Sequence, residues 1–261
     1  MSIFIPDIIN KNAHEIRVIQ DTDQIPIKVA DEFPEVDLCE ITGNGNTISR
    51  AGVVAIAPDF DPYNLSPCEE IFPALRRLFV VALLWRGMPP KLIVAMLGEP
   101  NLRETLCDAA TAVAFGMYGE AYDVFKRAKI PQLDRSIASV YLYFCSVKIT
   151  YPIKALIFDE KVARALLCSD ISTAKVIWQG FWQYLTGLAS YKFDPVKFSS
   201  DWKADGYLQF LILMHSWASA LKCEPAQIQI WLSKKCENLE LTYGKFNKPE
   251  DVGIAGDLLD I

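Results

Sequence analysis

The strongest constraint on the fold is a long series of segments in which apolar residues recur at helical spacing. Between residues 67 and 236 glycine and proline bound these segments, as at Gly87, Gly98 and Pro131. We expect helices at residues 67–85, 91–97, 101–115, 118–129, 137–145, 159–167, 172–190, 200–222 and 225–236. The chain is therefore predicted to be mainly α.

The first 66 residues differ from the rest. They hold short extended-looking pieces at 15–20, 25–30, 36–41 and 52–57, which turn residues such as those at 43–46 separate. We expect a small β-containing or irregular N-terminal lobe over residues 1–66 and a helical domain over residues 67–261.

Composition narrows the class of protein. The chain has 261 residues, of which 51% are hydrophobic, so it can bury a substantial core. Its formal net charge of −6 opposes general binding to nucleic acid, although an acidic protein can still carry a basic patch on one face. The longest apolar run, residues 78–85, is too short to span a membrane, and the start has no signal-peptide pattern. We expect a cytoplasmic protein without membrane contact.

Cysteine and histidine limit the chemistry. None of the seven cysteines forms a CxxC pair, so no metal site, iron–sulfur cluster or other cofactor is expected. Cysteines such as Cys107 and Cys145 lie in apolar helical patterns and are interpreted as small buried hydrophobes in a reducing compartment. Only His14 and His215 are available as histidine bases, and His215 lies in a very apolar run, which disfavours Ser–His and Cys–His hydrolases.

Large apolar side chains at helical positions predict the core. We expect the following residues to be largely buried: Trp85, Phe115, Leu142, Phe144, Leu156, Val162, Leu166, Trp178, Leu211 and Trp217.

Residues 112–167 carry the most specific pattern in the chain. The sequence DRSIASVYLYF at 134–144 precedes a loop and then ALIFDEKVARALL at 155–167, and AVAFG at 112–116 lies upstream. This arrangement resembles a bacterial family with the 8-oxoguanine DNA glycosylase fold, in the helix-hairpin-helix glycosylase superfamily. The resemblance implies two helical subdomains with a cleft, a helix-hairpin-helix near residues 130–146, and DNA as the partner.

The resemblance also implies a catalytic position and two departures. Asp159 matches the family's catalytic aspartate, which stabilises the cationic sugar as the base leaves or orients water. Val140 stands where bifunctional members carry a nucleophilic lysine, and Asp134 stands at the hairpin glycine, where its charge would repel a phosphate. Lys148 and Lys154 are alternative amines. An aspartate that precedes a helix is also an ordinary N-cap, so a purely structural role for Asp159 stays open.

Further residues are candidates for contacts with nucleic acid. Around the hairpin and the segment after it, the candidates for phosphate contact are Arg135, Ser136, Ser139, Lys148, Lys154 and Lys161. For a pocket that stacks an extruded base, the candidates are Phe115, Trp178 and Trp182, although aromatic residues at helical spacing also suit plain core packing.

Two functions follow from these observations. The first is a monofunctional DNA N-glycosylase that recognises a flipped modified base and uses Asp159. The second is a catalytically degenerate subunit of the same fold that binds nucleic acid or protein. By analogy with similar bacterial proteins, a role in antiphage defence with protein partners from the same operon is a further hypothesis.

Overall fold

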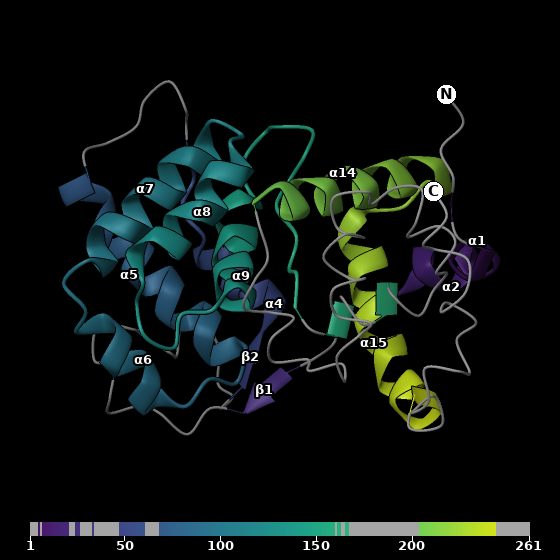
Figure 1. The fold of residues 1–261 in the computed structure, drawn as a ribbon, viewed down its shortest axis with the longest axis horizontal. Coiled ribbons are helices and arrows are strands. Elements are labelled where there is room, and N and C mark those ends of the chain that lie inside the picture. The colour runs from purple at the N-terminus through teal and green to yellow at the C-terminus, as the bar shows by residue number, and fades with distance from the viewer. Residues whose placement is uncertain are drawn as a thin grey trace, which may run out of the picture. The chain divides into compact units, whose positions relative to one another are not determined.

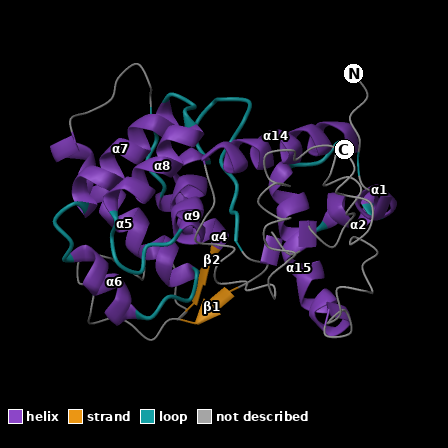
Figure 2. Ribbon diagram, viewed as in Figure 1, coloured by secondary structure: helices purple, strands orange, loops and turns teal. Residues whose placement is uncertain are grey.

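The computed structural model describes residues 5, 7–20, 24–26, 33, 47–60, 68–159, 161–162, 165–166 and 204–243, with side chains as far as residue 235. These residues are mostly helical, and the sheet among them has two short strands (Figures 1 and 2). The predicted mainly α fold is confirmed. The helix expected at 172–190 lies outside the described residues.

The chain divides into two compact units. The larger unit contains residues 20–159 and 199–215, and the smaller unit contains residues 1–19, 160–198 and 216–261. Each unit joins segments that are distant in sequence, so these compact units cut across the expected boundary at residue 66.

The larger unit is built on a helical core. Its helices are α4 (Arg50–Ile56), α5 (Cys68–Trp85), α6 (Pro90–Leu97), α7 (Leu102–Ala114), α8 (Tyr118–Ala128), α9 (Arg135–Ser146) and the first part of α14 (Ala204–Leu221). Helices α5, α7 and α8 all pack against α9 (Figure 1). Every residue of α9 except Ser136 is buried, because its sequence is apolar around the whole helix. Helix α9 is thus the central helix of this unit.

The smaller unit brings the start of the chain onto its C-terminal part. Helices α1 (Asp7–Lys11) and α2 (Ala13–Val18) come first, and α2 packs against α15 (Pro225–Tyr243). The Arg17 Nε donates to the carbonyl of Leu221 at 2.7 Å, and the Gln227 Nε2 donates to the carbonyl of Arg17 at 2.8 Å. A cation at the last residue of α14 also suits the negative end of the helix dipole.

Two of the extended pieces expected near the N-terminus are helices instead. Residues 15–20 fall largely in α2, and residues 52–57 fall largely in α4. The Ser49 hydroxyl accepts from the Gly52 amide at 3.1 Å, and this N-cap starts a helix despite the β-branched valines that follow. The piece at 25–30 is confirmed in part: β1 (Gln24–Pro26) pairs antiparallel with β2 (Thr47–Ser49). The piece at 36–41 lies outside the described residues.

Some helix ends differ from expectation. The Asn101 side chain makes no capping bond to α7, and the Thr105 hydroxyl instead donates to the Asn101 carbonyl at 2.6 Å. Gly119 lies inside α8, where a Cβ would come within 2.8 Å of Leu208 Cδ1 of α14, so this glycine permits close packing rather than ending a helix. Helix α15 continues past residue 236 to Tyr243.

The predicted core is confirmed with one exception among the described residues. Phe115 is 46% exposed, because α7 ends at Ala114 and the next glycine, Gly116, adopts a φ of +71° that turns the chain away. The residues confirmed as buried are Trp85, Leu142, Phe144, Leu156, Val162, Leu166, Leu211 and Trp217. Trp178 lies outside the described residues.

A disulfide joins Cys68, at the start of α5, to Cys107 of α7. This corrects the interpretation of Cys107 as a buried free thiol. The two residues are 39 positions apart and meet only because α5 and α7 pack together, so their spacing carried no signal. Arg103 supports the same contact, since it pairs with Glu69 at 3.2 Å and stacks on Phe72.

Reduction of this disulfide is expected to lower the free energy of unfolding by about 4 kcal/mol, because the open chain gains conformational entropy mainly in the unfolded state. Urea unfolding with and without a phosphine reductant measures the change. The Cys68→Ser, Cys107→Ser double variant is the control, and its midpoint should not respond to reductant. Equal midpoints for the oxidised and reduced wild type would show that the bond contributes nothing to stability.

Candidate functional site

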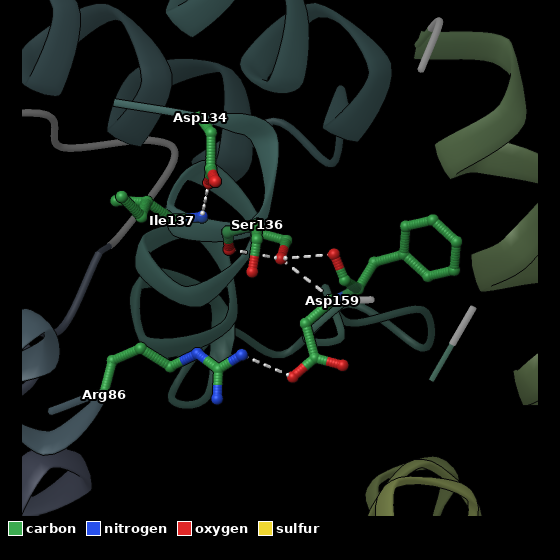
Figure 3. A network of polar contacts seen from close by, with 7 residues as sticks. Arg86, Asp134, Ser136, Ile137 and Asp159 are labelled. Carbon is green, nitrogen blue, oxygen red and sulfur yellow. Dashed lines mark hydrogen bonds and ion pairs between the residues drawn. The ribbon is translucent and has the colours of Figure 1, made fainter. Parts of the chain in front are cut away.

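Asp159 is the one Asp or Glu that is buried among the described residues. The residue is 6% exposed, and its Oδ2 lies 2.7 Å from the Arg86 Nη2 (Figure 3). It directly precedes residue 160, and the described residues 161–162 and 165–166 are helical, as the expected helix at 159–167 requires. A buried carboxylate with a charged hydrogen-bond partner keeps a fixed orientation.

Arg86 reaches Asp159 because of how α5 ends. Gly87 adopts a φ of +80°, its amide donates to the Leu84 carbonyl at 2.9 Å, and the Met88 amide donates to the Leu83 carbonyl at 3.0 Å. This is the glycine-based C-terminal motif that satisfies the last carbonyls of a helix. The motif fixes Arg86 at the end of α5, where a cation also interacts favourably with the helix dipole.

Hydroxyl groups fix the segment that carries Asp159 onto α9. The Ser139 hydroxyl accepts from the Phe158 amide at 2.9 Å, and the Ser146 hydroxyl accepts from the Ala155 amide at 3.0 Å. On the other side, the Tyr207 hydroxyl of α14 donates to the Leu156 carbonyl at 2.9 Å. Residues 155–159 therefore have a defined backbone although they form no regular element.

Val140 is part of the buried helix α9. Val140 is fully buried and shares a helix face with Phe144, one turn later. The Phe144 ring packs edge-on against Trp85 at 5.3 Å, and Trp85 directly precedes Arg86. The Arg50 guanidinium lies over the rings of Trp85 and Tyr143, at 5.2 and 5.1 Å. Arg50 thus contacts Trp85, the residue that directly precedes Arg86.

The hairpin between α8 and α9 spans residues 129–134 and matches the expected position. Its positive φ angles fall at Lys129 (52°) and Gln132 (67°), and not at Asp134, where the resemblance put the glycine. Asp134 is instead extended (φ −86°), and its Oδ1 accepts from the Ile137 amide at 2.9 Å (Figure 3). A carboxylate therefore caps the N-terminus of α9, which is where an external phosphate would need free N–H groups.

The candidates for phosphate contact lie in different environments. Lys148 Nζ donates to the carbonyls of Ala57 (2.5 Å) and Ala55 (3.2 Å), and Lys154 Nζ donates to the carbonyl of Val147 (2.8 Å). Both amines thus bind carbonyls near the C-terminal ends of α4 and α9.

The remaining candidates differ in exposure. Ser139 is fully buried and Arg135 is 9% exposed, so neither presents its polar group openly at the surface. Ser136 is half-buried, and Lys161 is exposed. Arg135, Ser136 and Ser139 all lie on α9, whereas Lys161 belongs to the smaller unit.

Of the candidates for a base pocket, the structure describes Phe115. Phe115 and Met117 flank Gly116, and a Cβ on Gly116 would lie 3.7 Å from the Tyr151 ring. The Tyr118 hydroxyl donates to the Ile153 carbonyl at 2.6 Å, which holds this loop against the start of α8. Phe115, Met117, Tyr151 and Ile153 are exposed apolar residues. Trp178 and Trp182 lie outside the described residues.

The Cys145 thiol and the Tyr118 hydroxyl of this unit stay protonated at neutral pH. Burial raises the pKa of the Cys145 thiol to about 12, so almost no thiolate forms at neutral pH. Burial, with a smaller contribution from Tyr151, raises the pKa of Tyr118 to about 12, so its hydroxyl stays a hydrogen-bond donor. Within the described ranges, no group of three or more His, Cys, Asp or Glu side chains is placed to hold a metal ion.

Sequence reasoning missed Arg86, Arg50 and Trp85. Arg50 and Trp85 belong to α4 and α5, and Arg86 directly follows α5, so all three lie outside the motif at residues 112–167. A signal was present in the arginine at the last turn before Gly87, since an arginine and a glycine commonly end a helix. Nothing in the sequence pairs that arginine with a residue 73 positions later.

A comparison with known protein families identifies the family of this chain. Residues 12–233 match the family described as "Putative 8-oxoguanine DNA glycosylase OGG-like protein". The chain belongs to this OGG-like family. No curated protein and no solved structure matches it at a significant level.

The OGG-like match confirms the family that residues 112–167 suggested, and it extends over both compact units. It makes the chain DNA-glycosylase-like and makes DNA its class of partner. Separately, none of the helices in the described part of this OGG-like chain is long and apolar enough to cross a membrane.

Proposed function

We propose that this OGG-like chain is a monofunctional DNA N-glycosylase, which releases a modified base and leaves the strand intact. The observation that carries the proposal is the Asp159 carboxylate, buried and paired with Arg86 at 2.7 Å. A merely solvated N-cap would need neither burial nor a charged partner. The hydrogen bonds to Ser139 and Ser146 hold the backbone before it in one position.

In the proposed reaction the bond between the base and the sugar C1′ breaks, and the base leaves with the bonding electrons. Asp159 stabilises the positive charge that develops on the sugar. A water oxygen then bonds to C1′, and a proton from that water ends on the departing base. Val140 has no amine for attack on C1′, and the amines of Lys148 and Lys154 donate to backbone carbonyls.

The test is a panel of duplex oligonucleotides, each with one modified base, incubated with the full chain. We expect release of free base, detected by mass spectrometry, and strand breaks only after alkaline treatment of the abasic product. Borohydride should trap no covalent adduct. A trapped adduct would show that an amine attacks the sugar, and the monofunctional mechanism would then be wrong.

A second candidate, a degenerate subunit that binds without catalysis, is favoured by Asp134. Its carboxylate occupies the N-terminus of α9 and adds negative charge at the hairpin. Binding of DNA without release of any base in the panel would support this candidate. Release of a base would exclude it.

The biological role of the proposed enzyme depends on which modified base it removes. An enzyme that removes a modified base suits defence against foreign DNA that carries such bases, and it would act in the cytoplasm together with products of neighbouring genes. Survival of cells challenged with phages of modified and unmodified DNA, with and without the gene, tests this role.

A further inference from the structure

Arg86 has hydrogen-bonding capacity beyond its contact with Asp159. The guanidinium has five N–H donors, and the ion pair engages its Nη2. The Arg86 side chain is 37% exposed, whereas that of Asp159 is 5% exposed. No other partner of this guanidinium occurs among the described residues. One edge of the Arg86 guanidinium therefore faces a buried carboxylate, while the side chain is also partly open to solvent.

Charge makes this arrangement relevant to DNA. A carboxylate near a phosphodiester repels it, and an arginine at 2.7 Å from that carboxylate supplies a cation that attracts the phosphate. Guanidinium groups suit phosphate oxygens, because their donors form a planar fork. The hairpin offers one amide donor fewer to a phosphate than a glycine turn would, because the Ile137 amide donates to the Asp134 carboxylate. Arg86, which follows α5, can supply a phosphate donor from another element.

We propose that Arg86 binds a backbone phosphate next to the nucleotide whose sugar meets Asp159. One guanidinium then links the catalytic carboxylate to the DNA backbone and sets the register of the strand over the site. This inference rests on the proposed function. It assigns to the end of α5 a DNA contact that is separate from the hairpin.

The experiment measures DNA affinity against salt concentration. The probe is a fluorescent duplex with one tetrahydrofuran abasic-site analogue, which cannot lose a base. Its anisotropy is measured at KCl concentrations from roughly 50 to 300 mM, because contacts with phosphates weaken over this range. Arg86→Gln should reduce the slope of log affinity against log salt by about 1, the loss of one phosphate contact. Arg86→Lys keeps the charge and should keep the slope.

Arg103→Gln is the matched control. Arg103 is also partly exposed and paired with a carboxylate, Glu69, but it lies at the start of α7. Its removal should leave the slope unchanged. A slope for Arg86→Gln equal to that of the wild type would overturn the inference.

A second measurement needs no variant and so does not depend on the folding of Arg86→Gln. Phenylglyoxal modifies accessible arginines, and mass spectrometry of the wild type gives the extent at each position. DNA should protect Arg86 several-fold and leave Arg103 unprotected. Equal modification of Arg86 with and without DNA would overturn the inference. Base release is scored separately, so a phosphate contact without catalysis is distinguishable from catalysis without this contact.

Discussion

Asp159→Asn is expected to reduce the rate of base release about 1000-fold, equivalent to about 4 kcal/mol of transition-state stabilisation. The amide has nearly the shape of the carboxylate and can still accept a hydrogen bond from Arg86. It carries no negative charge to oppose the cationic sugar. Single-turnover kinetics with enzyme in excess measure the chemical step directly.

Asp134→Asn is a control that removes the same charge elsewhere in the unit. Asp134 caps α9 and has no part in the proposed reaction, so its variant should release base at a rate close to that of the wild type. Anisotropy on the abasic-analogue duplex should show that Asp159→Asn still binds DNA. Release by Asp159→Asn at the wild-type rate would reduce Asp159 to a structural role.

Val140→Lys, which places an amine where the resemblance to bifunctional glycosylases puts the nucleophile, is expected to lower the free energy of unfolding by about 4–5 kcal/mol at pH 7. Val140 is fully buried on a helix whose neighbours are apolar, so the ammonium group has no water around it. Burial lowers the pKa of such a lysine far below its ordinary value. Urea unfolding at several pH values measures the cost.

The dependence of stability on pH tests whether the buried amine causes the loss of stability in Val140→Lys. The unfolded Val140→Lys chain binds a proton that the folded chain does not, so its stability rises with pH toward the ordinary lysine pKa. The cost should fall to about 2 kcal/mol at pH 9. Val140→Met, an uncharged control of similar length, should show no such trend. A stable lysine variant that borohydride traps on DNA would show that position 140 is open to the substrate.

Sequence patterns predicted the helices well where local signals agreed. Helix α5 begins at Cys68 after a proline and ends before Gly87, and α9 lies within one or two residues of its expected bounds. The pattern failed for residues 52–57, where the β-branched Val53 and Val54 suggested a strand. The Ser49 cap outweighed that weak preference.

For the catalytic position and its phosphate contacts, the sequence pattern predicted residues only within the stretch 112–167. Spacing placed Asp159 after a buried helix and a loop, and the structure describes both. It assigned Lys148 and Ser139 to DNA, whereas Lys148 binds the carbonyls that end α4 and Ser139 holds the Phe158 amide. Sequence spacing gives the direction of a side chain along a helix, and it does not give the backbone groups that compete for that side chain.

Residue types and their spacing are enough to predict that this chain is mainly helical, that α9 is buried on nearly all sides, and that position 140 has no amine. These are properties of residue type and local periodicity, which act within one or two helical turns. Tertiary structure alone decided that Cys68 meets Cys107 and that Arg86 meets Asp159. Both pairs depend on helix packing, since ion pairs and disulfides form between whichever groups the folded core brings within a few ångströms.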